Sequence, residues 1–370
     1  MPGNDGPKDD LPEDVCPNGI HGLSRRRLLK ALAVGGGAAA GTALLPERWV
    51  KPIVEYGALP LHAHVSPSGP FAYITNNNPN TGGPSGPGSV SVIDTAINTV
   101  VATVTVGVEP IGVAVNAAGT RVYVANAAGD ISIIDAAARS VIATVLVGTN
   151  PFGSAVNPAG TRVYVANGFS GNASIIDVTG VPSVVATVPV GNFPIGVAVN
   201  PTSPRVYVAN GNSANVSVID TTTNTVVATV PVGGGPRGVS AHPTGSHVYV
   251  ANSNANSVSI IRTSDNAVVA TVLVGGAPFG IAVNPAGTFV YTANSNSNNV
   301  SVIRTSDNTV VATVPVGAKP RGLAVNPAGT RVYVANENAN TVSVINTATN
   351  TVIATVVVGT RPFAFGLFIG

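Results

Sequence analysis

The chain has 370 residues, enough for one large or two ordinary domains, and charged residues make up only 9% of it. Its formal net charge of +2 is too small to suggest a nucleic-acid-binding protein. The single cysteine, Cys16, supports neither a disulfide framework nor a cysteine metal site, and the abundance of Val, Ile and Thr favours strands over helices.

The first element along the chain is a signal-like segment. The basic stretch SRRRLLK (24–30) precedes 15 apolar residues rich in Gly and Ala (31–45), which is typical of a secretory signal peptide. The pair Arg25 and Arg26 resembles the twin-arginine export motif, with Leu28 where Phe is usual. We expect export to the periplasm, cell surface or exterior. An uncleaved membrane anchor is the alternative, but the run is shorter than the roughly 20 residues that span a bilayer, so no stable span is expected.

Two places fit signal cleavage. Small residues precede a cut after Ala43, which is favoured, and a second, poorer site follows Ala63. The expected organisation is therefore a signal peptide at 1–43, a linker at 44–59 and one large domain at 60–370.

Beyond residue 60 the chain repeats. The phrase RVYVAN or a close variant occurs seven times, and its tyrosines are spaced by 50, 41, 43, 42, 42 and 42 residues. A period of roughly 40–45 residues with four strands per unit is typical of a β-propeller. These tyrosines are Tyr73, Tyr123, Tyr164, Tyr207, Tyr249, Tyr291 and Tyr333.

One unit, 320–359, illustrates the four predicted strands. Strand a is GLAVN (322–326), strand b RVYVAN (331–336), strand c TVSVIN (341–346) and strand d TVIATVVVG (351–359). Each is short, β-branched and bounded by turn residues. Both faces of VYVA are apolar, as in a strand buried on both sides. The sequence thus predicts an all-β fold, a seven-bladed β-propeller of four-stranded antiparallel blades.

The prolines indicate the order of the strands within a blade. Pro189, Pro231 and Pro315 share one position in strand d, and proline is confined to edge strands because it lacks an N–H. Strand d is therefore expected at the rim, and strand a, with its small residues, around the central channel.

The repeated phrase also carries a family resemblance. The units resemble the YVTN-type β-propeller repeat, with Tyr73-Ile74-Thr75-Asn76 the copy nearest to the family phrase. This resemblance implies an exported or cell-surface protein of bacteria or archaea. It says little about activity, because propellers host many functions.

The last ten residues, 361–370, begin an eighth strand a and stop. Two segments are therefore candidates for the inner strand of the first blade, HAHVS (62–66) and FAFGLF (363–368). We expect 361–370 to close the ring.

The sequence offers no recognisable catalytic motif, so neither catalytic residues, a cofactor nor a metal site is expected. His242 and His247 flank an a–b turn, but a zinc site needs three or four ligands and no Cys or acidic residue stands near them. We interpret them as turn residues.

Departures from the repeat mark the candidate binding site. The d–a and b–c loops share one end of the channel, and the residues there differ between blades. Apolar and charged side chains around one opening are typical of a ligand site; solvated loop variation is the alternative. The candidates are Arg237, Arg321, Arg361, Lys319, Glu109, Phe152, Phe279 and Phe363.

The hypothesis favoured by these features is a non-catalytic, monomeric binding or scaffold module whose ligand is a protein, a glycan or a small molecule. The alternatives are a propeller enzyme, either a lactonase-like hydrolase or a dehydrogenase-type subunit, and a structural surface-layer component. Glu109 beside Arg237 or Arg321 is the acid–base group that an enzyme would have at this opening.

Overall fold

The computed structural model describes residues 70–77 and 86–370, which form 27 strands in seven sheets. The strands are β1 (Phe71–Asn76), β2 (Pro87–Asp94), β3 (Thr99–Val108), β4 (Pro110–Val115), β5 (Arg121–Asn126), β6 (Asp130–Asp135), β7 (Ser140–Leu146), β8 (Pro151–Val156), β9 (Arg162–Asn167), β10 (Asn172–Asp177), β11 (Ser183–Pro189), β12 (Pro194–Val199), β13 (Arg205–Asn210), β14 (Asn215–Asp220), β15 (Thr225–Pro231), β16 (Pro236–Ala241), β17 (His247–Asn252), β18 (Ser257–Arg262), β19 (Ala267–Leu273), β20 (Pro278–Val283), β21 (Phe289–Asn294), β22 (Asn299–Arg304), β23 (Thr309–Pro315), β24 (Pro320–Val325), β25 (Arg331–Asn336), β26 (Thr341–Asn346) and β27 (Thr351–Val357).

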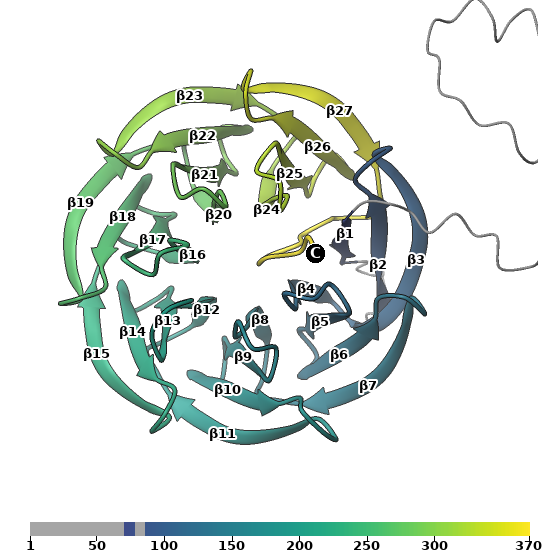
Figure 1. The fold of residues 1–370 in the computed structure, drawn as a ribbon, viewed down its shortest axis with the longest axis vertical. Coiled ribbons are helices and arrows are strands. Elements are labelled where there is room, and N and C mark those ends of the chain that lie inside the picture. Colours follow the sequence, from purple (N-terminus) through teal and green to yellow (C-terminus); the bar gives the residue numbers. More distant parts are fainter. Residues whose placement is uncertain (1–69, 78–85) are drawn as a thin grey trace, which may run out of the picture. The chain divides into compact units, whose positions relative to one another are not determined.

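The sheets form a ring of blades, which confirms the predicted seven-bladed propeller. Blade 1 consists of β1–β3, and blades 2 to 7 are the six four-stranded antiparallel sheets that follow in chain order. Figure 1 shows the first strand of each four-stranded sheet lining the centre and the last strand forming the rim. Strands a and d therefore lie where the small residues and the prolines indicate.

The C-terminal residues lie against β1, on the inner side of the three-stranded blade. The Tyr73 and Phe71 N–H groups donate to the carbonyls of Phe368 and Gly370, both at 2.9 Å, and the Phe363 N–H donates to the Thr75 carbonyl. The same segment runs parallel to β4, where the Val113 N–H donates to the Phe365 carbonyl at 2.9 Å. Figure 1 shows this yellow segment inside the ring, between β1 and β4.

Close approach of neighbouring inner strands depends on one glycine in each of the six four-stranded blades. A Cβ on Gly112 would lie 1.9 Å from the Phe152 carbonyl oxygen, and one on Gly196 2.1 Å from that of Arg237. In blade 7 the equivalent Gly322 faces Ala364, and a Cβ on this glycine would lie 1.7 Å from the Ala364 carbonyl oxygen. Residue 364 thus takes the place that the next blade's inner strand takes elsewhere, so the backbone of 361–370 completes the circle of contacts.

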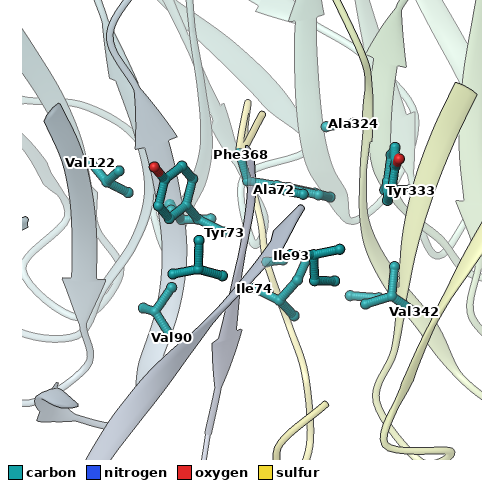
Figure 2. Close-up of a cluster of buried hydrophobic side chains, with 14 of the residues drawn as sticks. Ala72, Tyr73, Ile74, Val90, Ile93, Val122, Ala324, Tyr333, Val342 and Phe368 are labelled. Carbon is teal, nitrogen blue, oxygen red and sulfur yellow. The ribbon is translucent and has the colours of Figure 1, made fainter. Parts of the chain in front are cut away.

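Apolar side chains fill the spaces between blades. The tyrosines of the repeated phrase are at most 2% exposed, and Val, Ile and Ala from strands b and c surround them. Figure 2 shows the cluster on both faces of blade 1, where Phe368 of the C-terminal segment lies between Tyr73 and Tyr333, beside Ala72. Burial on both faces explains the apolar VYVA pattern and the low charge.

The arginine of RVYVAN has a defined partner in several blades. Arg121 and Arg205 stand directly opposite Asp135 and Asp220 on strand c and form ion pairs with them. In blades 5 and 6 strand c ends in arginine instead, and strand b then begins with His247 or Phe289. This pairing is not the same in every blade, because Phe71 stands opposite Asp94 and Arg331 stands opposite Asn346.

Several sequence predictions fall on residues outside the described part of the chain. These are the export pair Arg25 and Arg26, the cleavage sites at Ala43 and Ala63, the linker 44–59 and the whole of the 62–66 alternative. Within 70–77 and 86–370 no helix is long and apolar enough to cross a bilayer.

Candidate functional site

The backbone of the d–a turns fixes the direction of the side chains at that end of the channel. The residue before each proline has a positive φ, with values of 54° for Glu109, 55° for Phe193, 55° for Lys319 and 50° for Arg361. This conformation is unusual for residues other than glycine, and still more so before proline. Hydrogen bonds stabilise it, since each carbonyl accepts the N–H of the b–c loop in the same blade, as from Glu337 to Lys319 at 3.0 Å.

Phenylalanines close the channel at the d–a end. Phe279 packs edge-to-face on Phe363 and on Phe365, with ring centroids 5.4 Å apart in both pairs, and Phe152 lies beside Phe363 at 6.4 Å. Phe279 is 6% and Phe363 9% exposed. Ile111 and Ile195 complete this aromatic plug. Phe279 and Phe363 therefore serve chiefly as its packed interior.

Three cations surround one buried carboxylate beside the plug. The Arg321 Nε–H donates to Glu337 Oε2 at 2.6 Å, the Arg361 Nη2–H donates to Oε1 at 2.7 Å, and Lys319 Nζ lies 3.5 Å from Oε2. The Glu337 side chain is 1% exposed. Burial alone would raise the pKa of Glu337, but the arginine hydrogen bonds outweigh it and hold the pKa below its usual value. With Glu337 ionised, this group carries a net charge of about +2.

Arg237 stands apart from this cluster. Its guanidinium lies over the rings of Phe193 and Phe279, at 6.0 and 5.7 Å, and Arg321 also lies over Phe279, at 4.8 Å. Among the described residues Arg237 takes part in no ion pair, and its Nε is buried without a hydrogen-bond partner. Burial and, after it, the charge of Arg321 lower the pKa of Arg237. An anion at this position would relieve both effects.

Comparisons with known proteins agree on the fold. Residues 227–352 match the family model described as a lactonase, 7-bladed beta-propeller. The hydrazine synthase of Kuenenia stuttgartiensis is similar in structure, with a TM-score of 0.64 and 25% identity over 70% of this chain and 90% of that one. A functionally unknown protein from Desulfotomaculum acetoxidans has a TM-score of 0.69 and 16% identity over 82% and 98% of the two chains. No curated protein sequence matches this chain.

The segment similar to lactonases contains most of the cationic cluster but ends before Arg361. It includes Glu337, which we did not predict as a site residue. The signal was present, because the six other blades have Asn, Ala, Gly or Ser after the repeated Asn, and Glu337 is one of only two glutamates beyond residue 60. Phe193 and Phe365 were also not among the candidates.

The remaining candidates are Phe152, which packs beside Phe363, and Glu109. Glu109 is partly buried in the d–a turn of blade 2, and the acid that Arg321 contacts is Glu337. Phe169, on a b–c loop, is 71% exposed and lies 5.7 Å from Phe193. The structure thus brings Arg237, Arg321, Phe279 and Phe363 into contact, and Arg361 and Lys319 join them through Glu337.

His242 and His247 lie at the opposite end, in an a–b turn. Their ring centroids are 6.5 Å apart, and His242 Nε2 is 3.0 Å from the Gly287 carbonyl. Burial, followed by the proximity of His242, lowers the pKa of His247. Within the described residues, no group of three His, Cys, Asp or Glu side chains is placed to hold a metal ion.

Proposed function

We propose that this chain is a non-catalytic binding propeller that holds an anionic group of its ligand, a carboxylate or a phosphate, at the d–a end of the channel. The observation that supports it most is Arg237, a partly buried arginine without an acidic partner, stacked on two phenylalanines. An arginine in this setting is suited to a carboxylate or a phosphate, because its donors form a rigid fork that matches either group and its face is already covered.

The neighbouring charges support the same ligand class. Lys319, Arg321 and Arg361 share one carboxylate, so cations outnumber anions around Arg237. Lys319 and Arg361 are 38% and 46% exposed, which leaves part of each available to a ligand at the surface. Exposed Phe169 adds an apolar contact at the edge.

Calorimetric titration with citrate and with inorganic phosphate tests this proposal. Arg237→Met keeps a stem of similar length and removes the charge, so it should weaken binding at least tenfold. Arg262→Met is the matched control, because Arg262 is an exposed arginine paired with Asp265 on the outer side of blade 5. Equal binding by the wild type and Arg237→Met would contradict the proposal, as would equal loss in both variants.

A second candidate function is lactone hydrolysis, which the match of residues 227–352 to the lactonase propeller family favours. A screen of aliphatic and sugar lactones, with and without added divalent metal ions, tests it. Hydrolysis above the buffer rate that Arg237→Met abolishes would replace the binding proposal with an enzymatic one. No rate above buffer for any lactone would count against this candidate.

We also propose that the protein is exported through the twin-arginine-type signal at Arg25 and Arg26. Replacement of both arginines by lysine should retain the protein in the cytoplasm. N-terminal sequencing of the exported form then distinguishes cleavage after Ala43 from cleavage after Ala63. Export of the double variant at the wild-type level would contradict this assignment.

A further inference from the structure

Two phenylalanines of neighbouring blades form an open aromatic surface beside the proposed anion site. Phe169, in the b–c loop of blade 3, is 71% exposed, and its ring centroid lies 5.7 Å from that of Phe193, in the d–a turn of blade 4. Phe193 is partly buried and also packs edge-to-face on Phe152, at 5.8 Å. Within 70–77 and 86–370, Phe169 is the one Phe, Tyr or Trp side chain that is largely exposed.

Both phenylalanines depart from the repeat. The b–c loops of four other blades have asparagine at the position of Phe169: Asn212, Asn254, Asn296 and Asn338. The residue before the d–a proline is phenylalanine only at Phe193 and is elsewhere Glu109, Asn150, Gly235, Ala277, Lys319 or Arg361. Because the same loop forms with asparagine in four blades, the fold does not require an aromatic ring at residue 169.

Phe193 links the exposed ring to the cation proposed to hold the anion. The guanidinium of Arg237 lies 6.0 Å from the Phe193 ring centroid, so one ring contacts both Arg237 and Phe169. On the other side of Arg237, Phe279 is only 6% exposed and Arg321 is already paired with a carboxylate. A ligand anchored at Arg237 therefore finds its open apolar surface toward Phe193 and Phe169.

We propose that the ligand of this site has an aromatic ring next to its anionic group and that the ring packs on Phe169 and Phe193. This inference rests on the proposed anion site and names the class of ligand that the site prefers. Aromatic pairs are stabilised beyond the burial of their area, through edge-to-face and offset-stacked contacts. An aromatic acid should therefore bind more tightly than an aliphatic acid of the same size.

Calorimetric titration with two pairs of anions tests the preference. The pairs are 3-phenylpropanoate with propanoate and phenyl phosphate with methyl phosphate. In at least one pair the aromatic member should bind about tenfold more tightly, through burial of the ring and its aromatic contacts. 3-Cyclohexylpropanoate should bind about two- to tenfold more weakly than 3-phenylpropanoate, because its ring is apolar but not aromatic. No gain from the aromatic ring in either pair, or equal affinity for the cyclohexyl analogue, would overturn the proposal.

The substitution Phe169→Asn isolates the exposed ring. It introduces the residue that four other blades have here and removes a side chain that is mostly in solvent, so the fold should be retained. It should weaken binding of the tighter aromatic anion about fivefold, the effect of one aromatic contact, and leave propanoate binding unchanged. Leu146→Asn is the matched control, because Leu146 is 79% exposed on the rim strand β7. Unchanged binding of the aromatic anion in Phe169→Asn, or equal loss in both variants, would contradict the proposal.

The two proposals can fail separately. If aromatic and aliphatic anions bind equally well and both lose affinity in Arg237→Met, the anion site remains and only the aromatic preference is wrong. If Arg237→Met binds every one of these anions as the wild type does, the anion site is wrong, and the inference that rests on it is wrong as well.

Discussion

The two ends of the channel are formed by the same inner strands but differ in chemistry. At the d–a end, residues that change from blade to blade place arginines, a lysine and phenylalanines around one buried glutamate. At the a–b end, residues that mostly repeat form a wall without charged side chains. In a repeat protein, the positions that are the same in every repeat maintain the ring. Residues that bind a ligand are therefore expected at positions that differ between repeats. Arg237 is such a break, at the d–a end.

The largest expected effect comes from the segment that both ends share. Deletion of 361–370 removes Phe363 and Phe365 from the plug, Phe368 from the core and part of the channel wall at the a–b end. Burial of each phenylalanine contributes about 1.5–3 kcal/mol, and each kcal/mol corresponds to about 2–4 °C in a domain of this size. The melting temperature should fall by more than about 10 °C, as scanning calorimetry can measure.

Single substitutions show whether residues 361–370 stabilise the ring through their buried side chains. Phe368 is fully buried, whereas Leu367 is 61% exposed. Phe368→Ala should lower stability by about 3 kcal/mol or more, and Leu367→Ala should have a much smaller effect. Unchanged melting of the deletion variant would show that 361–370 does not stabilise the ring.

The sequence predicted the scaffold well because the repeat identifies each strand several times. In blade 7 the predicted strands b and c coincide with β25 and β26. Strand a begins earlier, at Pro320, and ends at Val325, and strand d ends earlier than predicted, at Val357. The period of 42 residues and the apolar faces sufficed, because neighbour packing in a propeller is the same at every blade. The place of Arg121 was not predicted, since its partner Asp135 depends on the strand register.

The site was predictable only in part. The variable positions identified Arg237, Arg321 and Phe279, but sequence spacing could not show that Phe279 and Phe363 would be buried. It also could not show that Arg361 meets Glu337, because closure of the ring sets that contact between residues 24 apart in sequence. Burial and charge pairing depend on how the blades converge, which a single repeat does not contain.

Neutralising Glu337 should destabilise the d–a end of the channel without affecting the a–b end. Glu337→Gln leaves Arg321, Arg361 and Lys319 near one another without their shared carboxylate. Because Glu337 is buried and its partners are partly exposed, we expect a loss of about 2 kcal/mol or more in the free energy of unfolding. Urea denaturation at pH 7 measures it.

The difference in stability between the wild type and Glu337→Gln should depend on pH. Because folding lowers the pKa of Glu337 below its usual value of 4.5, its ionised form stabilises the native state above that pH. The stabilisation is lost as the pH falls through the lowered native value. The difference between the wild type and Glu337→Gln should therefore be constant near neutrality and decrease below about pH 4.5. A difference that grows on acidification would contradict the assigned role of Glu337.

Replacement of Arg237 should reduce ligand binding but hardly change stability, whereas replacement of Glu337 should reduce stability. Its charge is partly buried, unpaired and close to Arg321, so removing it costs no ion pair. Arg237→Met retains an apolar contact with Phe193 and Phe279, and we expect stability within about 1 kcal/mol of the wild type or slightly above it. Urea denaturation measures the change. A loss comparable to that of Glu337→Gln would indicate that Arg237 is structural.

The smallest expected effect lies at the rim, away from both ends, and shows whether the blades are equivalent there. Leu273 ends β19 at the position that proline occupies in Pro189, Pro231 and Pro315, with the same pairing to strand c. Leu273 is 77% exposed, so its side chain contributes little to stability. Proline reduces the conformational entropy of the unfolded chain. Leu273→Pro should therefore raise the free energy of unfolding by about 0.4–1 kcal/mol. Proline one residue earlier, at buried Val272, should destabilise the protein, since there it would remove a core side chain. If Leu273→Pro is equally destabilising, β19 does not share the rim geometry of its neighbours.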